Sequence, residues 1–240
     1  MKNNFFEFKQ FTVQQDRCAM KVSTDACLFG AWVAQTVQEL QLSCNSVLDI
    51  GTGTGLLALM LAQKTSAQIV AVEMEGAACE QAMDNTAASN WAQRIKVVHA
   101  DIKAMQTEKK YDLIISNPPF YENSLLSPDA VSNHAKHSQA LTLQQLLQAV
   151  NNYIEPAGHF AVLLPYQRTV FFKELAFAEG YHLLSLLLVR HSLDHPISRS
   201  CLLFSRNGGG LMIREEMVIK QRNHYTGKFI ELLKDYYLYL

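Results

Sequence analysis

The stretch SVLDIGTGTG, residues 46–55, joins a short apolar strand to a glycine-rich turn. Residues 46–50 are typical of a strand, and the run from Leu56 to Gln63 is typical of the helix that follows it. Gly51, Gly53 and Gly55 allow the backbone to turn tightly into that helix and to approach a ligand closely. A strand, a glycine turn and a helix in this order indicate an open α/β sheet with a ligand site at the carboxyl ends of its strands.

Strand-like runs alternate with helix-period segments along the rest of the chain. The expected strands are residues 46–50, 69–73, 95–99, 111–116, 159–164, 183–189 and 200–205. The expected helices are residues 56–63, 76–90, 141–153 and 170–179. This alternation predicts an α/β fold, a three-layer, doubly wound, mostly parallel seven-stranded sheet of the Rossmann-like kind. The long non-helical stretch 191–199 favours an antiparallel end of that sheet.

Composition indicates a soluble globular protein. The chain has 240 residues, of which 49% are hydrophobic and 18% charged. No apolar run reaches the ~18 residues that span a bilayer, and the first residues contain no signal-peptide core. The five cysteines are scattered without a C-x-x-C spacing, so we expect neither a metal site nor a disulfide framework. These features predict a reduced, cytoplasmic protein without a membrane partner.

The charge is unevenly distributed. A formal net charge of -1 argues against a protein that coats nucleic acid nonspecifically. Residues 190–228, however, contain seven basic and three acidic side chains, with three histidines in the same stretch. A solvated surface explains this excess, and a polyanion-binding edge is the alternative.

Acidic residues stand at the ends of the first three expected strands. Asp49 precedes the glycines, Glu73 ends the second strand and Asp101 follows the third. With no pyrophosphate to bind, a helix N-terminus and Asp49 can face a zwitterionic amino-acid group. Glu73 is placed to accept two ribose hydroxyls. Asp101 can accept from an adenine amino group while Ile102 packs on the ring, and together these features predict an S-adenosylmethionine pocket.

The sequence NPPF, residues 117–120, follows the fourth expected strand. A planar amino nitrogen is a poor nucleophile because its lone pair is delocalised. The Asn117 side-chain oxygen and the Pro118 carbonyl can accept its two N–H groups and favour the tetrahedral form. Pro118 and Pro119 fix the backbone so that both acceptors point one way, and Phe120 offers a face for a flat substrate. A strand ended by a proline turn is the simpler reading, and the cofactor pattern upstream favours methyl transfer.

The order of these motifs resembles the class I S-adenosylmethionine-dependent methyltransferases, in the branch that methylates amino groups, over residues 46–205. Residues 8–13, 16–26 and 28–32 look like the start of the bacterial tRNA1(Val) adenine-37 N6-methyltransferase family. Residues 218–240 look similar to the family's terminal helix. The resemblance implies methylation of adenine N6 in a tRNA anticodon loop, with S-adenosylmethionine as cofactor and Asn117 counted in both sites.

The resemblance also implies an organisation and further site residues. Residues 1–45 precede the first expected strand, and Thr24 or Asp25 can cap a helix from residue 26 to about residue 37 there. The resemblance implies that this extension caps the cofactor site and that residues 46–240 form the methyltransferase domain of a single-domain protein. We expect a monomer because no segment resembles a dimerisation element. Residues 20–25 would close over the cofactor, with Asp25 orienting the helix. Lys21, Tyr121 and Lys136 would contact RNA. Lys136 stands where the family often has arginine, and lysine lacks the bidentate fork.

Other readings remain open at this point. Guanine N2 of ribosomal RNA and the side-chain amide of a protein glutamine both fit the NPPF pattern. A cofactor-dependent RNA-binding module without turnover is a rival of another class, which Asn117 and the three glycines disfavour. A nicotinamide dehydrogenase would need G-x-G-x-x-G, and in that frame, counted from Gly51, the third glycine position falls on Leu56.

Overall fold

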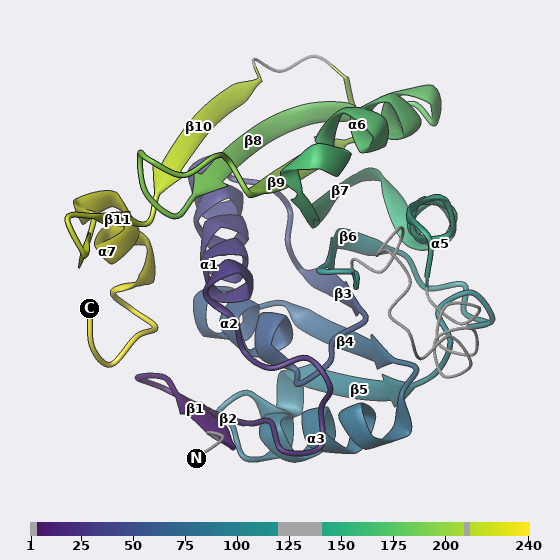
Figure 1. The fold of residues 1–240 in the computed structure, drawn as a ribbon. Helices are drawn as coiled ribbons and strands as arrows, with labels where there is room; N and C mark the ends of the chain where they lie inside the picture. Colours follow the sequence, from purple (N-terminus) through teal and green to yellow (C-terminus); the bar gives the residue numbers. More distant parts are fainter. Residues whose placement is uncertain (1–3, 120–140, 209–211) are drawn as a thin grey trace, which may run out of the picture.

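The computed structural model describes residues 4–119, 141–208 and 212–240 (Figure 1). Its centre is an eight-stranded sheet with the strand order β10-β8-β9-β7-β6-β3-β4-β5. The strands are β3 (Ser46–Ile50), β4 (Gln68–Glu73), β5 (Ile95–His99), β6 (Tyr111–Ser116), β7 (Ile154–Pro165), β8 (His182–Arg190), β9 (Arg199–Ser205) and β10 (Ile213–Val218). All neighbouring strands are parallel except β9, which is antiparallel to both β7 and β8. The predicted mostly parallel sheet is confirmed, and its antiparallel strand β9 lies near one end of the sheet but is not the edge strand.

Two details of the sheet differ from the prediction. The sheet has an eighth strand, β10, which pairs in parallel with β8. Three of its six residues are charged, so its sequence IREEMV lacks the apolar run that identifies the other strands. Strand β7 begins at Ile154 rather than 159 and includes Pro156 and Gly158, and its pairing with β6 shifts register there. An irregular strand start of this kind tolerates proline.

Helices cover both faces of the sheet, as Figure 1 shows. The helices are α1 (Thr24–Glu39), α2 (Leu56–Lys64), α3 (Gly76–Ala87), α5 (Leu143–Tyr153), α6 (Thr169–Ala178) and α7 (Gly227–Leu233). One apolar core lies between the sheet and α1, α2 and α7, and a second lies between the opposite face and α5 and α6. The three-layer, doubly wound architecture is therefore confirmed.

The start of α1 corrects one prediction. The helix begins at Thr24, and its cap is Ser23, whose side-chain oxygen accepts a hydrogen bond from the Ala26 amide at 3.2 Å. Neither Thr24 nor Asp25 is the cap. Ser23 has the extended backbone that N-cap residues adopt, whereas Thr24 and Asp25 already belong to the first turn.

The two ends of the chain pack together against this core. Strands β1 (Phe5–Glu7) and β2 (Thr12–Gln14) form an antiparallel hairpin. Phe8 bridges to Tyr237, and the Lys9 amide donates to the Tyr236 carbonyl at 2.8 Å. A second hairpin, β11 (Lys220–Gln221) with β12 (His224–Tyr225), precedes α7. Within the parts of the chain that the structure describes, no helix is long and apolar enough to cross a membrane.

Candidate functional site

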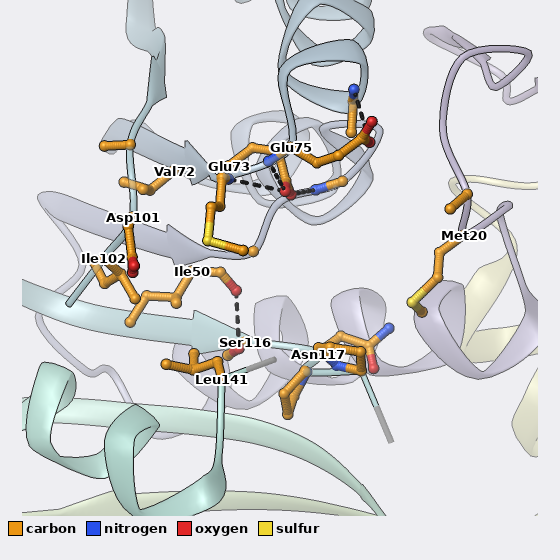
Figure 2. A pocket seen from close by; sticks show the side chains of 18 of the residues that line it. Met20, Ile50, Val72, Glu73, Glu75, Asp101, Ile102, Ser116, Asn117 and Leu141 are labelled. Carbon is orange, nitrogen blue, oxygen red and sulfur yellow. Dashed lines mark hydrogen bonds between the residues drawn. The ribbon is translucent and has the colours of Figure 1, made fainter. Parts of the chain in front are cut away.

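A cavity of about 600 Å³ opens at the carboxyl ends of β3, β4 and β6. Its volume is in the range of cofactor and ligand sites. Most of its wall comes from five regions, namely the segment before α1, the turn after β3, the turn after β4, the segment after β5 and the end of β6 (Figure 2). The lining residues are Cys18, Ala19, Met20, Ile50, Gly51, Gly53, Val72, Glu73, Met74, Glu75, Ala78, Ala100, Asp101, Ile102, Lys103, Ser116, Asn117, Pro118, Pro119 and Leu141.

The turn after β3 depends on glycine for its backbone conformation. Gly51, Gly53 and Gly55 have φ angles of +71°, +57° and +83°, in the left-handed region that other residues rarely adopt. A Cβ atom on Gly51 would meet nothing within 4 Å, so conformation rather than space requires glycine there. Gly51 and Gly53 line the cavity, and Gly55 is instead the N-cap residue of α2.

Glu73 joins two of the turns that line the cavity. Its Oε2 accepts from the Gly53 amide at 2.9 Å, and its Oε1 accepts from the Met74 and Glu75 amides, each at 2.9 Å. A carboxylate offers about four acceptor positions, of which these bonds use three. A diol on Glu73 would therefore take the remaining position and replace one of the three backbone donors, all of which belong to residues that line the cavity.

Asp49 lies beneath the glycine turn and does not line the cavity. Its side chain is fully buried, and its Oδ2 accepts from the Thr52 hydroxyl at 2.5 Å. Burial raises the pKa of Asp49 to about 7, and the charge of Glu73 adds to the rise. The structure therefore places this carboxylate where it holds the turn from below.

The segment after β5 supplies the wall that Figure 2 draws at the left. Asp101 and Ile102 both line the cavity, and the Ile102 side chain is buried. Asp101 Oδ1 accepts from the Lys103 amide at 2.9 Å, and its Oδ2 lies 3.4 Å from Lys103 Nζ. An adenine amino group would compete with the lysine for the second oxygen.

The end of β6 presents Asn117, Pro118 and Pro119 to the cavity. The Ser116 hydroxyl donates to the Ile50 carbonyl at 2.9 Å and so ties this end to β3. Asn117 Oδ1 is buried and has no hydrogen-bond partner among the residues that the structure describes. Buried polar atoms without a partner are rare, and this one stands at a cavity where a ligand can supply a donor. Phe120, Tyr121 and Lys136 lie outside the described residues.

Two predicted residues of the N-terminal extension lie away from the cavity wall. Residues 18–20 line the cavity, whereas Lys21 and Asp25 do not. Asp25 Oδ2 instead forms an ion pair with Arg199 Nε at 2.9 Å, which links the first turn of α1 to the start of β9. The extension therefore reaches the cavity through residues 18–20, which share only Met20 with the predicted segment 20–25.

Several of the residues that line the cavity were not predicted from the sequence. Met74 and Glu75 follow Glu73 directly, and their position next to a strand end is the signal that could have identified them. Cys18 and Leu141 carry no such signal, because only the folded chain brings them to this edge. Within the described parts of the chain, no group of three or more His, Cys, Asp or Glu side chains could hold a metal ion.

This sheet, with its D-x-G-x-G-x-G turn and its Asn-Pro-Pro strand end, defines a class I S-adenosylmethionine-dependent methyltransferase. Solved structures support the fold. A predicted O-methyltransferase from Agrobacterium tumefaciens matches with a TM-score of 0.65 and 15% identity, over 88% of this chain and 96% of that chain. A putative class I S-adenosylmethionine-dependent methyltransferase from Listeria monocytogenes matches with a TM-score of 0.61 and 15% identity, over 84% and 67%.

Sequence comparison defines the family. The methyltransferase small domain model matches residues 31–164. The tRNA1(Val) (adenine(37)-N6)-methyltransferase of Bacteroides fragilis is 40% identical over 99% of both chains. The proteins of the same name from Christiangramia forsetii and Serratia proteamaculans are 39% and 40% identical, over 100% and 98% of this chain and 100% and 90% of theirs. The chain belongs to the methyltransferase small domain family and, within it, to the tRNA1(Val) (adenine(37)-N6)-methyltransferase family.

Proposed function

We propose that the protein transfers a methyl group from S-adenosylmethionine to N6 of adenine 37 in the anticodon loop of tRNA1(Val). The observation that carries the chemistry is the buried Asn117 Oδ1, which has no hydrogen-bond partner among the described residues, at a cavity that Pro118 also lines. The relatives' shared name supplies the tRNA and the nucleotide. Their 39–40% identity over nearly the whole chain supports assigning the same substrate to this protein.

The residues around the cavity suit S-adenosylmethionine in three places. The left-handed glycine turn leaves the backbone open beside Gly51 and Gly53. Glu73 retains an acceptor position for a ribose hydroxyl, and Asp101 with Ile102 suits an adenine amino group and ring. When bound, the cofactor supplies an electrophilic methyl group on a sulfonium centre. Asp49, Gly55 and Asp25 would support the site without contacting the cofactor, because none of the three lines the cavity.

The chain's contribution to the reaction is orientation. The Asn117 oxygen and the Pro118 carbonyl accept hydrogen bonds from the two N–H groups of N6, which frees the nitrogen lone pair to attack the methyl carbon. As the new carbon–nitrogen bond forms, the bond from that carbon to sulfur would break, and the sulfur would leave with the bonding electron pair as a neutral thioether. The nitrogen then loses a proton to water, since that proton becomes acidic once the bond forms, and no side-chain base is required. The site acts by positioning and by preorganised acceptors. Phe120 and Tyr121 would stack on the base, a role that stays a prediction.

Exposed basic and histidine side chains at the carboxyl edge of the sheet suit a polyanionic substrate. Strands β8 and β10 end at the same edge as β6, and the Lys220 amide donates to the His191 carbonyl at 2.8 Å, so the two following turns lie side by side. His191, Arg222 and His224 are exposed there. These side chains would attract the phosphates of an anticodon stem, as would Lys21 and Lys136.

The sheet topology places only some of the basic residues in 190–228 at the edge of the sheet that holds the cavity. Arg206 follows the end of β9 and Arg214 lies near the start of β10, which places both at the opposite edge. Arg190, Arg199 and Lys228 form ion pairs with Glu216, Asp25 and Glu215. The cationic surface near the site is therefore smaller than the sequence count indicated.

The test is methyl transfer from radiolabelled S-adenosylmethionine to tRNA that lacks its native modifications, followed by nucleoside digestion and chromatography. Label in N6-methyladenosine, lost when adenine 37 of the tRNA is replaced by guanine, is the expected result. No label in that tRNA, together with label in N2-methylguanosine of ribosomal RNA or in a protein glutamine when these are supplied instead, would overturn the proposal in favour of another amino substrate. A tRNA substrate would also place this protein in the cytoplasm, and a single elution peak at the mass of one chain would support a monomer.

A further inference from the structure

We infer that the α3 side chains Gln81, Asp84 and Asn85 hold residues 14–17 and thereby position Cys18, Ala19 and Met20 as one wall of the cofactor cavity. We call these three side chains the α3 bracket and residues 14–20 the N-terminal strap. The inference rests on the proposed cofactor site for its meaning, but its first measurement requires no cofactor.

Asn85 makes the central contacts of the bracket. Its side chain is 2% exposed. Its Oδ1 accepts from the Gln14 amide at 2.8 Å, and its Nδ2 donates to the Gln14 carbonyl at 2.9 Å and to the Thr54 carbonyl at 2.8 Å. Thr54 lies inside the glycine turn, so one amide group joins the strap to the turn. Only a side-chain amide offers this combination of one acceptor and two donors.

Gln81 and Asp84 extend the bracket along the same helix face, because residues three and four apart in a helix are neighbours. Gln81 is 1% exposed, and its Oε1 accepts from the Arg17 amide at 3.1 Å. The Arg17 guanidinium pairs with Asp84 and lies 3.6 Å from Glu80. The Arg17 and Asp84 side chains are 39% and 65% exposed, and ion pairs at such positions contribute little. The two buried amides therefore carry the attachment.

A further hydrogen bond joins the start of the strap to the residues that follow it. Gln15 is 5% exposed, and its Oε1 accepts from the Val22 amide at 2.8 Å, so residues 15–22 form a loop pinned at its base. The tip of this loop faces the cavity, as Figure 2 shows for Met20 opposite Asp101. Cys18 Sγ lies 3.7 Å from the position that a Cβ atom on Gly53 would occupy. Loss of the bracket should let the tip move away from the glycine turn.

Cys18 provides a direct probe of the strap. We expect Asn85→Ala to raise the rate of Cys18 alkylation by iodoacetamide at least about tenfold without cofactor, as read by peptide mass spectrometry. Cys44 is half-buried outside the strap and serves as the internal control, and its rate should not change. Cys27, Cys79 and Cys201 are buried and report loss of the fold. Arg94→Ala is the matched control, because it weakens the end of α2 without touching the strap.

Affinity provides the second readout. Calorimetry should show S-adenosylmethionine binding to Asn85→Ala about tenfold more weakly, while turnover at saturating cofactor stays near the original value. Asn85→Asp keeps the acceptor for the Gln14 amide, but in place of the two donors it turns a carboxylate oxygen toward the Gln14 and Thr54 carbonyls. Its Cys18 rate and its loss of affinity should therefore be at least as large as those of Asn85→Ala. Gln81→Ala, which removes only the acceptor for the Arg17 amide, serves in place of Asn85→Ala if that variant exposes the buried cysteines.

The outcomes separate this inference from the proposed function. An unchanged Cys18 rate in both Asn85 variants would overturn the inference, even if methyl transfer to tRNA is confirmed. A raised Cys18 rate with unchanged cofactor affinity would show that the bracket holds the strap but that the strap is not a cofactor wall, which also overturns it. If the original protein binds no S-adenosylmethionine, the proposed function fails, and the Cys18 rates still report whether the bracket holds the strap.

Discussion

Asn117 carries the chemistry that we propose. Its buried Oδ1 lacks a partner in the described part of the chain, and both Asn117 and Pro118 line the cavity. Asn117→Ala should lower turnover about 100- to 1,000-fold, as the loss of one preorganised polar contact does in other enzymes. Steady-state methyl transfer measures this loss, and calorimetry should show nearly unchanged cofactor affinity. A variant with near-normal turnover would contradict the role of Asn117 as the acceptor for N6.

Asp49 makes the stability of the protein depend on pH. Burial raises its pKa to about 7, against ~3.9 in an unfolded chain. Between these values the folded state binds more protons than the unfolded state, so this group lowers stability as the pH rises from about 4 to about 7. Asp49→Asn removes the ionisation while its amide oxygen can still accept from Thr52.

The free energy of unfolding of Asp49→Asn, relative to the original protein, should therefore increase through that pH window. The expected gain is about 1.4 kcal/mol for each unit by which the two pKa values differ. Urea unfolding of both proteins at about pH 4 and about pH 8 measures it. Parallel stability curves would show that Asp49 is ionised throughout.

At the scale of elements, Arg94 ties the loop before β5 to the end of α2. Its guanidinium donates to the carbonyls of Ala62, Thr65 and Ala67 at 2.7, 3.0 and 3.0 Å. Helix ends leave carbonyls without partners, and the half-buried Arg94 satisfies them here. Arg94→Ala should therefore lower the free energy of unfolding by about 2–4 kcal/mol, since hydrogen bonds to charged groups are worth ~1.5–3 kcal/mol each and are not additive. Denaturant midpoints measure the loss, and a change in turnover at saturating substrates would contradict a purely structural role.

The element scale also shows where pattern reading fails. Strands β3, β4 and β6 are apolar runs and were predicted nearly to the residue. Strand β10 was missed because half of it is charged, and its pairing with β8 alone makes it a strand. The N-cap of α1 was placed one or two residues late, because Ser23, Thr24 and Asp25 are all good caps and the sequence does not rank them.

At the scale of the whole molecule, both ends of the chain pack into the apolar core that lies between the sheet and helices α1 and α2. Phe229 and Leu233 of α7 are fully buried in the core that holds α1 and α2, and the Tyr236 hydroxyl donates to the Met60 carbonyl at 3.2 Å. Phe229→Ala should lower the free energy of unfolding by about 3–5 kcal/mol. Far-ultraviolet circular dichroism and the fluorescence of Trp32 and Trp91 should shift together to lower denaturant. Two separate transitions would contradict a single cooperative domain.

The sequence by itself determined the doubly wound sheet, the glycine turn and the residues at its strand ends, because these depend on periodicity and on chain neighbours. Gly51, Gly53, Glu73, Asp101, Ile102, Asn117, Pro118 and Pro119 do meet at one cavity. Only the tertiary structure decided that Asp49 is buried beneath the turn, that Asp25 pairs with Arg199, and that α3 holds the N-terminal strap against the cavity. The physical reason is distance along the chain. Asn85 contacts Gln14 across 71 residues and Thr54 across 31, and no local preference encodes such a contact before the chain is folded.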